Sequence, residues 1–147
     1  SHRMGAADRE VMFLAVGRDD GDLAGTLLAA CSGSGIALLA PPLWKLTEIP
    51  MPANCGTGKG VAVADINLDG STDVVFTCEN ANGNKSGVRW LSRSQTGLWN
   101  DHEISGSEGI KFDRIELLDL DQDGDLDVIT CEERANLGVI WYENPTR

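Results

Sequence analysis

The sequence predicts an all-β protein built from about three copies of one four-stranded unit. Its 147 residues include 17 glycines and five prolines, and its apolar residues fall in short β-branched runs. This composition is typical of strands joined by many tight turns. No stretch shows the sustained periodicity of an amphipathic helix. Short motifs recur at intervals of 47–55 residues, and a period in this range fits the four-stranded blade of a β-propeller.

Glycine, tryptophan and acidic positions carry the repeat. Residues 43–49 recur 55 residues later as residues 98–104, with Leu-Trp at the start and Glu-Ile at the end of both segments. Gly35, Gly87 and Gly138 each open an apolar run in successive copies. At this length, the copies together can form one domain with a hydrophobic core.

Each copy divides into β-rich runs bounded by turn-forming residues. We therefore expect one repeat domain over residues 11–147, with blades at residues 11–51, 52–108 and 109–147 and a last blade that lacks its fourth strand. Residues 1–10 are interpreted as the remnant of an expression tag followed by a lead-in. The expected strands are Val11–Val16, Thr26–Cys31, Ile36–Ala40, Trp44–Ile49, Val61–Ile66, Asp73–Cys78, Val88–Ser92, Trp99–Ile104, Ile115–Leu120, Asp127–Cys131 and Val139–Glu143.

Two acidic loops lie between the first and second expected strands of the second and third copies. Each loop alternates oxygen-bearing side chains over nine residues, with a glycine at the sixth position. Carboxylates this close repel one another unless a cation lies among them, and calcium takes about 6–8 oxygen ligands. We therefore predict two Ca²⁺ sites, against the alternative of solvated acidic turns without a metal. The predicted ligand positions are Asp65, Asn67, Asp69, Ser71 and Asp73 in one loop and Asp119, Asp121, Asp123, Asp125 (through its backbone carbonyl) and Asp127 in the other.

The spacing excludes an EF-hand. An EF-hand requires a bidentate Glu at position twelve of its loop and a helix on either side, whereas position twelve is Phe76 in one loop and Thr130 in the other. The runs that follow both loops are β-branched and predict strands. The first copy keeps only an Asp-Gly pair, at Asp20, with further aspartates close by. This remnant favours an ordinary acidic turn over a third ion site.

These features resemble the FG-GAP/VCBS repeats of β-propellers, the type also found in the head of integrin α-subunits. The matching features are the two Asp-x-Asp/Asn-x-Asp-Gly-x-x-Asp loops, the Val/Ile-rich strand after each loop, the Gly-Val-x-Trp strand and the Trp-x-x-x-Glu-Ile segment. The resemblance implies four-stranded blades around a central axis, with calcium bound by the loops that begin at Asp65 and Asp119. Propellers have about 4–8 blades. We therefore expect either a fragment of a longer propeller or a homo-oligomer, most simply a ring of two chains.

Composition narrows the classes of function. The formal net charge is −11 and no Lys/Arg run occurs, so nucleic acid is not an expected partner. No apolar run reaches the ~18 residues of a membrane span. His102 is the only histidine outside the tag remnant. The sequence therefore offers almost no ligands for a usual zinc site and almost no residues for a Ser-His-Asp triad. A binding module is therefore favoured over an enzyme.

The function predicted from these observations is that of an extracellular or periplasmic calcium-binding module. Calcium would be structural, and the ligand would be a protein or a glycan. The alternative is part of a calcium-dependent polysaccharide lyase or another carbohydrate-active enzyme, because some such lyases look similar to these propellers. A lyase needs a base and exposed cations to hold an acidic sugar, and the sequence contains no obvious cluster of this kind.

Cysteines and tryptophans are interpreted as packing residues. Cys31, Cys78 and Cys131 fall at equivalent places in successive copies. Neighbouring sheets pack about 10 Å apart, which is farther than a disulfide spans, so we expect buried thiols. Cys55 lies in a loop with no obvious mate. The tryptophans are expected to pack between blades rather than to stack on sugars; they are Trp44, Trp90, Trp99 and Trp141.

Overall fold

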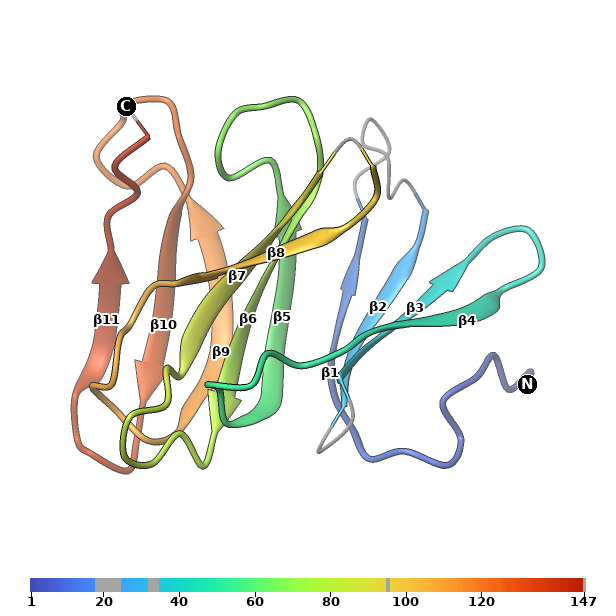
Figure 1. Ribbon diagram of the computed structural model, residues 1–147, viewed down its shortest axis with the longest axis horizontal. Coiled ribbons are helices and arrows are strands. Elements are labelled where there is room, and N and C mark those ends of the chain that lie inside the picture. Colours follow the sequence, from blue (N-terminus) through green and yellow to red (C-terminus); the bar gives the residue numbers. More distant parts are fainter. Residues whose placement is uncertain (18–24, 32–34, 95, 147) are drawn as a thin grey trace.

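The computed structural model describes residues 1–17, 25–31, 35–94 and 96–146. Within these residues the backbone forms eleven strands and no helix, which confirms the predicted all-β fold. The strands pair antiparallel in three sheets that stand side by side (Figure 1), and each sheet is one blade. Blade 1 contains β1 (Val11–Val16), β2 (Leu27–Cys31), β3 (Gly35–Ala40) and β4 (Lys45–Ile49); blade 2 contains β5 (Thr57–Ala64), β6 (Asp73–Glu79), β7 (Val88–Arg93) and β8 (Trp99–Glu103); blade 3 contains β9 (Phe112–Leu118), β10 (Asp127–Glu132) and β11 (Gly138–Tyr142).

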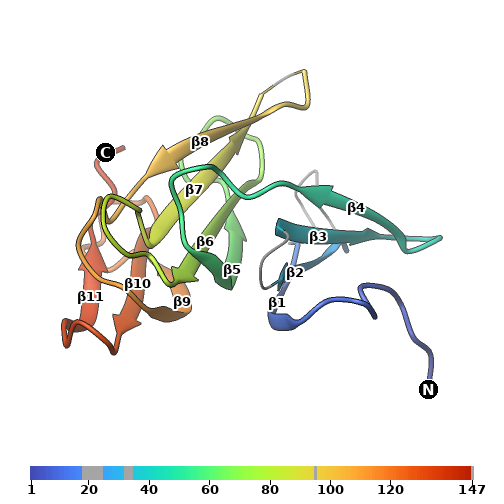
Figure 2. The ribbon, with the colours of Figure 1, turned by 60° about the horizontal axis from the view of Figure 1, so that its bottom comes forward.

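Within each blade the strands are hydrogen-bonded in chain order. The first strands, β1, β5 and β9, contact one another from blade to blade and form the inner line of the arrangement. β4 and β8 form the opposite, outer edges of their sheets (Figure 2). In blade 3 the corresponding edge strand is β11. Among the described residues, none forms a helix of the length and apolarity that a membrane crossing requires.

Strand bounds differ from the prediction mainly at the start of β5. This strand begins at Thr57 instead of Val61, and β9 likewise begins earlier than predicted. The additional residues of β5 include Gly58 and Gly60, and glycines of this kind predict a turn or a bulge rather than a regular strand. A Cβ atom at Gly60 would lie 2.6 Å from the carbonyl oxygen of Asp113 on β9. Glycine is therefore required here because the two inner strands approach so closely.

All three blades carry an irregularity at the same place. The pairing of the first strand with the second shifts register near the start of β1, after Gly58 in β5, and after Thr130 in β10. A bulge bends the strand and increases its local twist. Its recurrence indicates that the copies repeat in three dimensions as well as in sequence.

Two apolar cores fill the spaces between the sheets. Between blades 1 and 2, Ile49 packs in one cluster with Phe76. Between blades 2 and 3, Val88 packs in a second cluster with Phe112 and Val128. Both phenylalanines are completely buried, and burial of such a side chain stabilises the fold by about 1.5–3 kcal/mol. Blade 2 is therefore buried on both faces.

Polar contacts also join blade 2 to blade 3. Lys59 on β5 pairs with Glu79 (Nζ to Oε2, 2.9 Å) and with Asp113 on β9 (Nζ to Oδ1, 3.1 Å). Burial opposes the charge on Lys59, but hydrogen bonds to the two carboxylates outweigh burial and raise its pKa. The hydroxyl of Thr77 donates to the carbonyl oxygen of Asp113 at 2.6 Å. These contacts hold the inner strands together and thereby fix the positions of the loops that follow them.

Blade 3 exposes apolar side chains on the face that points away from blade 2. Val139 is 81% exposed and Trp141 45% exposed on β11, and Leu118 at the end of β9 is 51% exposed. The alternate residue Ile140 instead packs against the core between blades 2 and 3. This face is the one that a further blade would cover.

Candidate metal centre

Both acidic loops connect the first strand of a blade to its second strand, as the sequence predicts. One joins β5 to β6 and the other joins β9 to β10, and both lie at the same end of the molecule, uppermost in Figure 1. Their backbones follow the same path. Leu68 and Gln122 at the fourth position have φ values of 58° and 68°, and Gly70 and Gly124 at the sixth position have 87° and 96°. Positive φ is uncommon for residues other than glycine, so the shared shape is a specific one.

In the second loop three carboxylates converge. Asp119, Asp121 and Asp123 each offer an oxygen, and these oxygens lie within 4.8 Å of one another. Loop amides orient the carboxylates: Gly124 N donates to Asp119 Oδ2 at 3.2 Å, and Asp125 N donates to Asp123 Oδ1 at 3.1 Å. Three negative charges at this separation repel one another strongly unless a cation or protons neutralise them.

The first loop has the same residue positions but a different network of contacts. Both oxygens of Asp65 accept backbone hydrogen bonds, from Asp69 N at 3.0 Å and Gly70 N at 2.9 Å. Asn67 Nδ2 donates to Asp69 Oδ2 at 2.9 Å, and Ser71 N donates to Asp69 Oδ1 at 2.8 Å. The hydrogen bond from the Ser71 backbone, followed by the one from Asn67, lowers the pKa of Asp69. Asn67 thus puts a neutral amide where the second loop has the carboxylate of Asp121, and this amide also donates a hydrogen bond to the carboxylate of Asp69.

The ninth position of each loop is a buried aspartate at the start of the second strand. Asp73 is 0% exposed and Asp127 is 1% exposed. Each accepts a hydrogen bond from the backbone of its own loop: Ile66 N donates to Asp73 Oδ2, and Leu120 N donates to Asp127 Oδ2, both at 3.0 Å. Burial raises the pKa of Asp73 to about 6, although the hydrogen bond from Ile66 opposes this effect. These aspartates therefore face inward, beneath the exposed part of each loop.

The donor set fits calcium. Within the part of the chain that the structure describes, Asp73 Oδ1 and Asp119 Oδ1 are buried and accept no hydrogen bond. A buried polar atom without a partner is costly, and a bound cation would remove this cost in both loops. Carboxylate, amide and carbonyl oxygens at alternate positions are the hard ligands that calcium takes. The aspartates near Asp20, where the sequence keeps a remnant of the pattern, lie outside the described residues.

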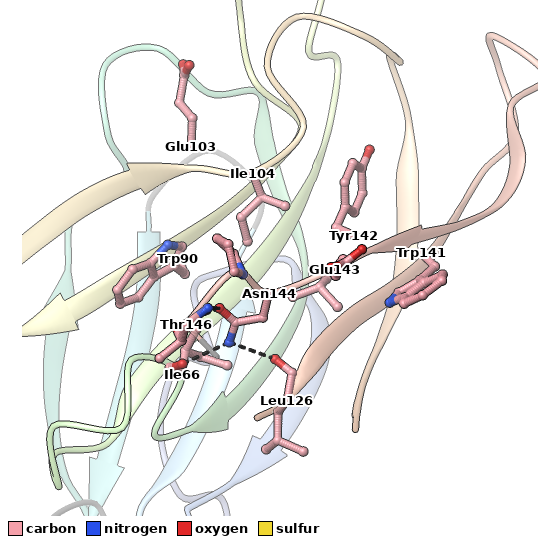
Figure 3. A pocket seen from close by; sticks show the side chains of 12 residues that line it. Ile66, Trp90, Glu103, Ile104, Leu126, Trp141, Tyr142, Glu143, Asn144 and Thr146 are labelled. Carbon is pink, nitrogen blue, oxygen red and sulfur yellow. Dashed lines mark hydrogen bonds between the residues drawn. The ribbon is translucent and has the colours of Figure 1, made fainter. Parts of the chain in front are cut away.

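Asn144 joins the two loops (Figure 3). Its Nδ2 donates to the carbonyl oxygen of Ile66 in the first loop at 2.9 Å and to that of Leu126 in the second loop at 3.2 Å. Its backbone N donates to Asp127 Oδ1 at 2.9 Å. Sequence reasoning missed this residue because the position equivalent to Asn144 in the second copy, counted from the shared tryptophan, is Arg93. The repeat therefore gives no signal for it.

A pocket of about 520 Å³ lies beside Asn144, between blades 2 and 3. Ligand pockets typically have about 300–1,000 Å³. The rings of Trp90 and Tyr142 line it, together with Glu143 (Figure 3). The pocket therefore combines aromatic surface with negative charge, next to the loops that carry the acidic clusters.

Two of the four tryptophans pack as predicted. Trp90 and Trp99 are partly buried and contact the cores on either side of blade 2. The prediction is wrong for Trp44 and Trp141, which are 36% and 45% exposed. Trp44 lies before β4 in a left-handed conformation, and Trp141 lies on a blade face without a neighbour. His102 stacks on Trp90 with ring centroids 4.0 Å apart, which is a packing role.

The sequence pattern of FG-GAP-like repeats matches residues 65–130. The matched span runs from the first aspartate of the first loop, Asp65, to Thr130 in the strand after the second loop. It therefore includes both acidic loops in full. No individual curated protein is similar enough to the chain to count as a match.

Proposed function

We propose, from the FG-GAP-like repeat that this chain carries at residues 65–130, that it is a β-propeller module with two structural calcium sites and a protein or glycan ligand. Repeats of this type typically occur in extracellular proteins, which supports an extracellular location. In this function calcium organises the loops and carries out no chemistry.

The convergence of Asp119, Asp121 and Asp123 supports the calcium sites most directly. Their oxygens lie within 4.8 Å of one another, and Asp119 Oδ1 is buried without a hydrogen bond among the described residues. Asp127 completes the set from the start of β10. The first loop would hold a second ion through Asp65, Asn67, Asp69 and Asp73, with Ser71 and Asp125 at the carbonyl positions of the two loops. A bound ion would supply positive charge that neutralises the carboxylates and fixes the loops.

The pocket between blades 2 and 3 is the proposed place for a ligand. An aromatic ring such as that of Tyr142 presents a large apolar face with a polar edge, and this suits the apolar face of a sugar ring. Glu143 at the same pocket would repel an acidic polysaccharide. This charge argues against the lyase alternative, whose substrate is an acidic sugar. The proposal therefore favours neutral glycans or a protein surface.

Thermal unfolding in the presence of calcium, magnesium or EGTA tests the calcium sites. A ligand at about 100 times its Kd stabilises by about 2.7 kcal/mol, which for a chain of this size is about 5–10 °C in Tm. We expect EGTA to lower Tm, calcium to restore it fully, and magnesium to restore it less, because magnesium tolerates such cages poorly. An unchanged Tm under all three conditions would rule out both sites.

Single substitutions assign the two sites. Asp119→Ala removes one of the four carboxylates predicted to bind through their side chains in the second loop, and Asp65→Ala removes one of three in the first loop. Since charge count is a main determinant of calcium affinity, calorimetry should show that Asp119→Ala abolishes the tighter binding event. Asp8→Asn, which changes an exposed carboxylate outside the loops, should leave both events intact. If the tighter event survives Asp119→Ala, the order of affinities is wrong.

Glycan-array binding of the calcium-loaded protein tests the ligand. Wild type is compared with Tyr142→Ala, which removes an aromatic ring that lines the pocket, and with Trp141→Ala, which changes the exposed opposite face of β11. Loss of binding in Tyr142→Ala but not in Trp141→Ala locates the ligand in the pocket. Release of an unsaturated sugar product from an acidic polysaccharide would instead favour the lyase alternative.

A further inference from the structure

Two cysteines come together in the core between blades 1 and 2. Cys55 precedes β5 and is 5% exposed, and Cys78 near the end of β6 is completely buried. Both carry free thiols and belong to the same apolar cluster. The sequence predicts no mate for Cys55, so the tertiary structure alone reveals this pair.

The backbone brings the two residues into close approach. Gly58 pairs with Cys78 and Thr57 pairs with Glu79 across β5 and β6. Immediately before these pairs, a Cβ atom at Gly56 would lie 2.1 Å from the carbonyl oxygen of Glu79. The chain neighbours of the two cysteines are therefore in direct contact, and a disulfide requires that the backbones of two cysteines approach closely.

The thiols themselves also interact. A hydrogen bond between the two side chains lowers the pKa of Cys55 and raises the pKa of Cys78. Cys55 Sγ also lies 2.9 Å from the carbonyl oxygen of Pro52, to which it donates. The thiol of Cys55 is therefore easier to ionise than the thiol of Cys78, which lies directly beside it.

We propose that Cys55 and Cys78 form a disulfide bond when the protein folds in an oxidising compartment. The oxidant is a low-molecular-weight disulfide such as oxidised glutathione. The Cys55 thiolate attacks one sulfur of this disulfide and releases one small thiol. The Cys78 thiol then loses its proton and attacks the Cys55 sulfur of the mixed disulfide, which releases the second small thiol. Two protein thiols are thus oxidised as one disulfide is reduced to two thiols.

The bond would close a loop of residues 55–78, which contains the whole of the first acidic loop. Because a crosslink restricts the unfolded chain, a loop of this length is expected to gain stability. For a chain of this size we expect Tm to rise by about 6–12 °C relative to the reduced protein. Formation of the bond does not depend on calcium. Tm of the oxidised and reduced protein is therefore compared at one saturating calcium concentration.

A peptide map under non-reducing conditions tests the proposal on the wild-type protein. The chain is refolded in a mixture of oxidised and reduced glutathione, then unfolded and alkylated without reductant. Trypsin cleaves after Lys45, Lys59 and Lys85 and separates the cysteines into peptides 46–59 and 60–85. We expect these two peptides to appear as one linked species, lighter than their sum by two hydrogens. Separate alkylated peptides would overturn the proposal.

Variants supply the second readout. Cys55→Ser should abolish the linked species and remove the dependence of Tm on reductant. Cys131→Ser changes a half-buried thiol in blade 3 and should keep both. If Cys55→Ser does not fold, the peptide map of the wild-type protein still shows whether Cys55 and Cys78 are linked. Persistence of the reductant effect in a folded Cys55→Ser variant would contradict the assignment of the pair.

Discussion

Glu132, the last residue of β10, provides the sharpest test of how blade 3 is held together. It is 2% exposed, and its carboxylate is enclosed by the segment before β9 and the connection from β10 to β11. Burial opposes its ionisation, but backbone N–H groups outweigh burial and hold its pKa at about 2. The N–H donors are those of Ile110, Lys111, Arg134, Ala135 and Leu137.

Replacement of Glu132 by Gln keeps the shape but removes the charge and one accepting oxygen. The amide nitrogen would then face N–H groups with nothing to accept their hydrogens. A pKa lowered from 4.5 to about 2 corresponds to about 3 kcal/mol. Screening by solvent at the end of the blade reduces the expected loss of unfolding free energy to about 2–3 kcal/mol at neutral pH.

The pH dependence has a defined sign. Because the folded-state pKa of Glu132 lies below its unfolded value, its stabilisation is complete above about pH 4.5 and is lost as the pH falls towards about 2. The difference in unfolding free energy between wild type and Glu132→Gln should therefore shrink over this interval. Urea unfolding at pH 7, 4 and 3 and one fixed calcium concentration measures it.

Glu133→Gln is the matched control. The carboxylate of Glu133 is largely exposed and pairs with Lys111. Loss of this carboxylate should therefore lower the unfolding free energy by less than about 1 kcal/mol. Equal unfolding free energies for wild type and Glu132→Gln at pH 7 would refute the reasoning, as would a difference that does not depend on pH.

Three further predictions concern packing, the loops and assembly. Gly87→Ala would place a Cβ atom 2.2 Å from the ring of Phe112 and should cost about 1–3 kcal/mol or more; a smaller penalty in the Phe112→Leu background would confirm the clash, and full additivity would contradict it. Asn144→Ala removes both side-chain hydrogen bonds between the loops and should weaken calcium binding in calorimetry, whereas Asn100→Ala should not. The exposed face at Val139 should associate with a second copy, so light scattering should give a two-chain mass that Val139→Glu reduces to one chain; a single-chain mass for wild type would contradict this.

Local sequence accounts for the strands and for the positions of the acidic loops. The β-branched runs after Asp73 and Asp127 predict β6 and β10 because such residues suit a pleated, half-buried surface. The nine-residue loop pattern predicts where oxygen ligands alternate, because this depends only on neighbours in the chain. Gly70 and Gly124 mark the sharp turn in each loop for the same reason.

Sequence prediction fails where a residue depends on a contact far along the chain. Gly60 indicates a turn by itself, and only the approach of β9 shows why it lies within a strand. The exposure of Trp141 depends on whether another sheet covers its face, which the spacing of tryptophans along the chain does not record. Side-chain environment is thus less predictable than strand identity.

Periodicity and turn residues act over a few positions, so the order of amino acids alone identifies a repeat of β-strands with two acidic loops. Folding in three dimensions sets which partners those positions meet. It brought Cys55 against Cys78 and directed Asn144 to both loops. These contacts arise from the packing of one blade against the next and from hydrogen bonds between distant segments, neither of which a local pattern encodes.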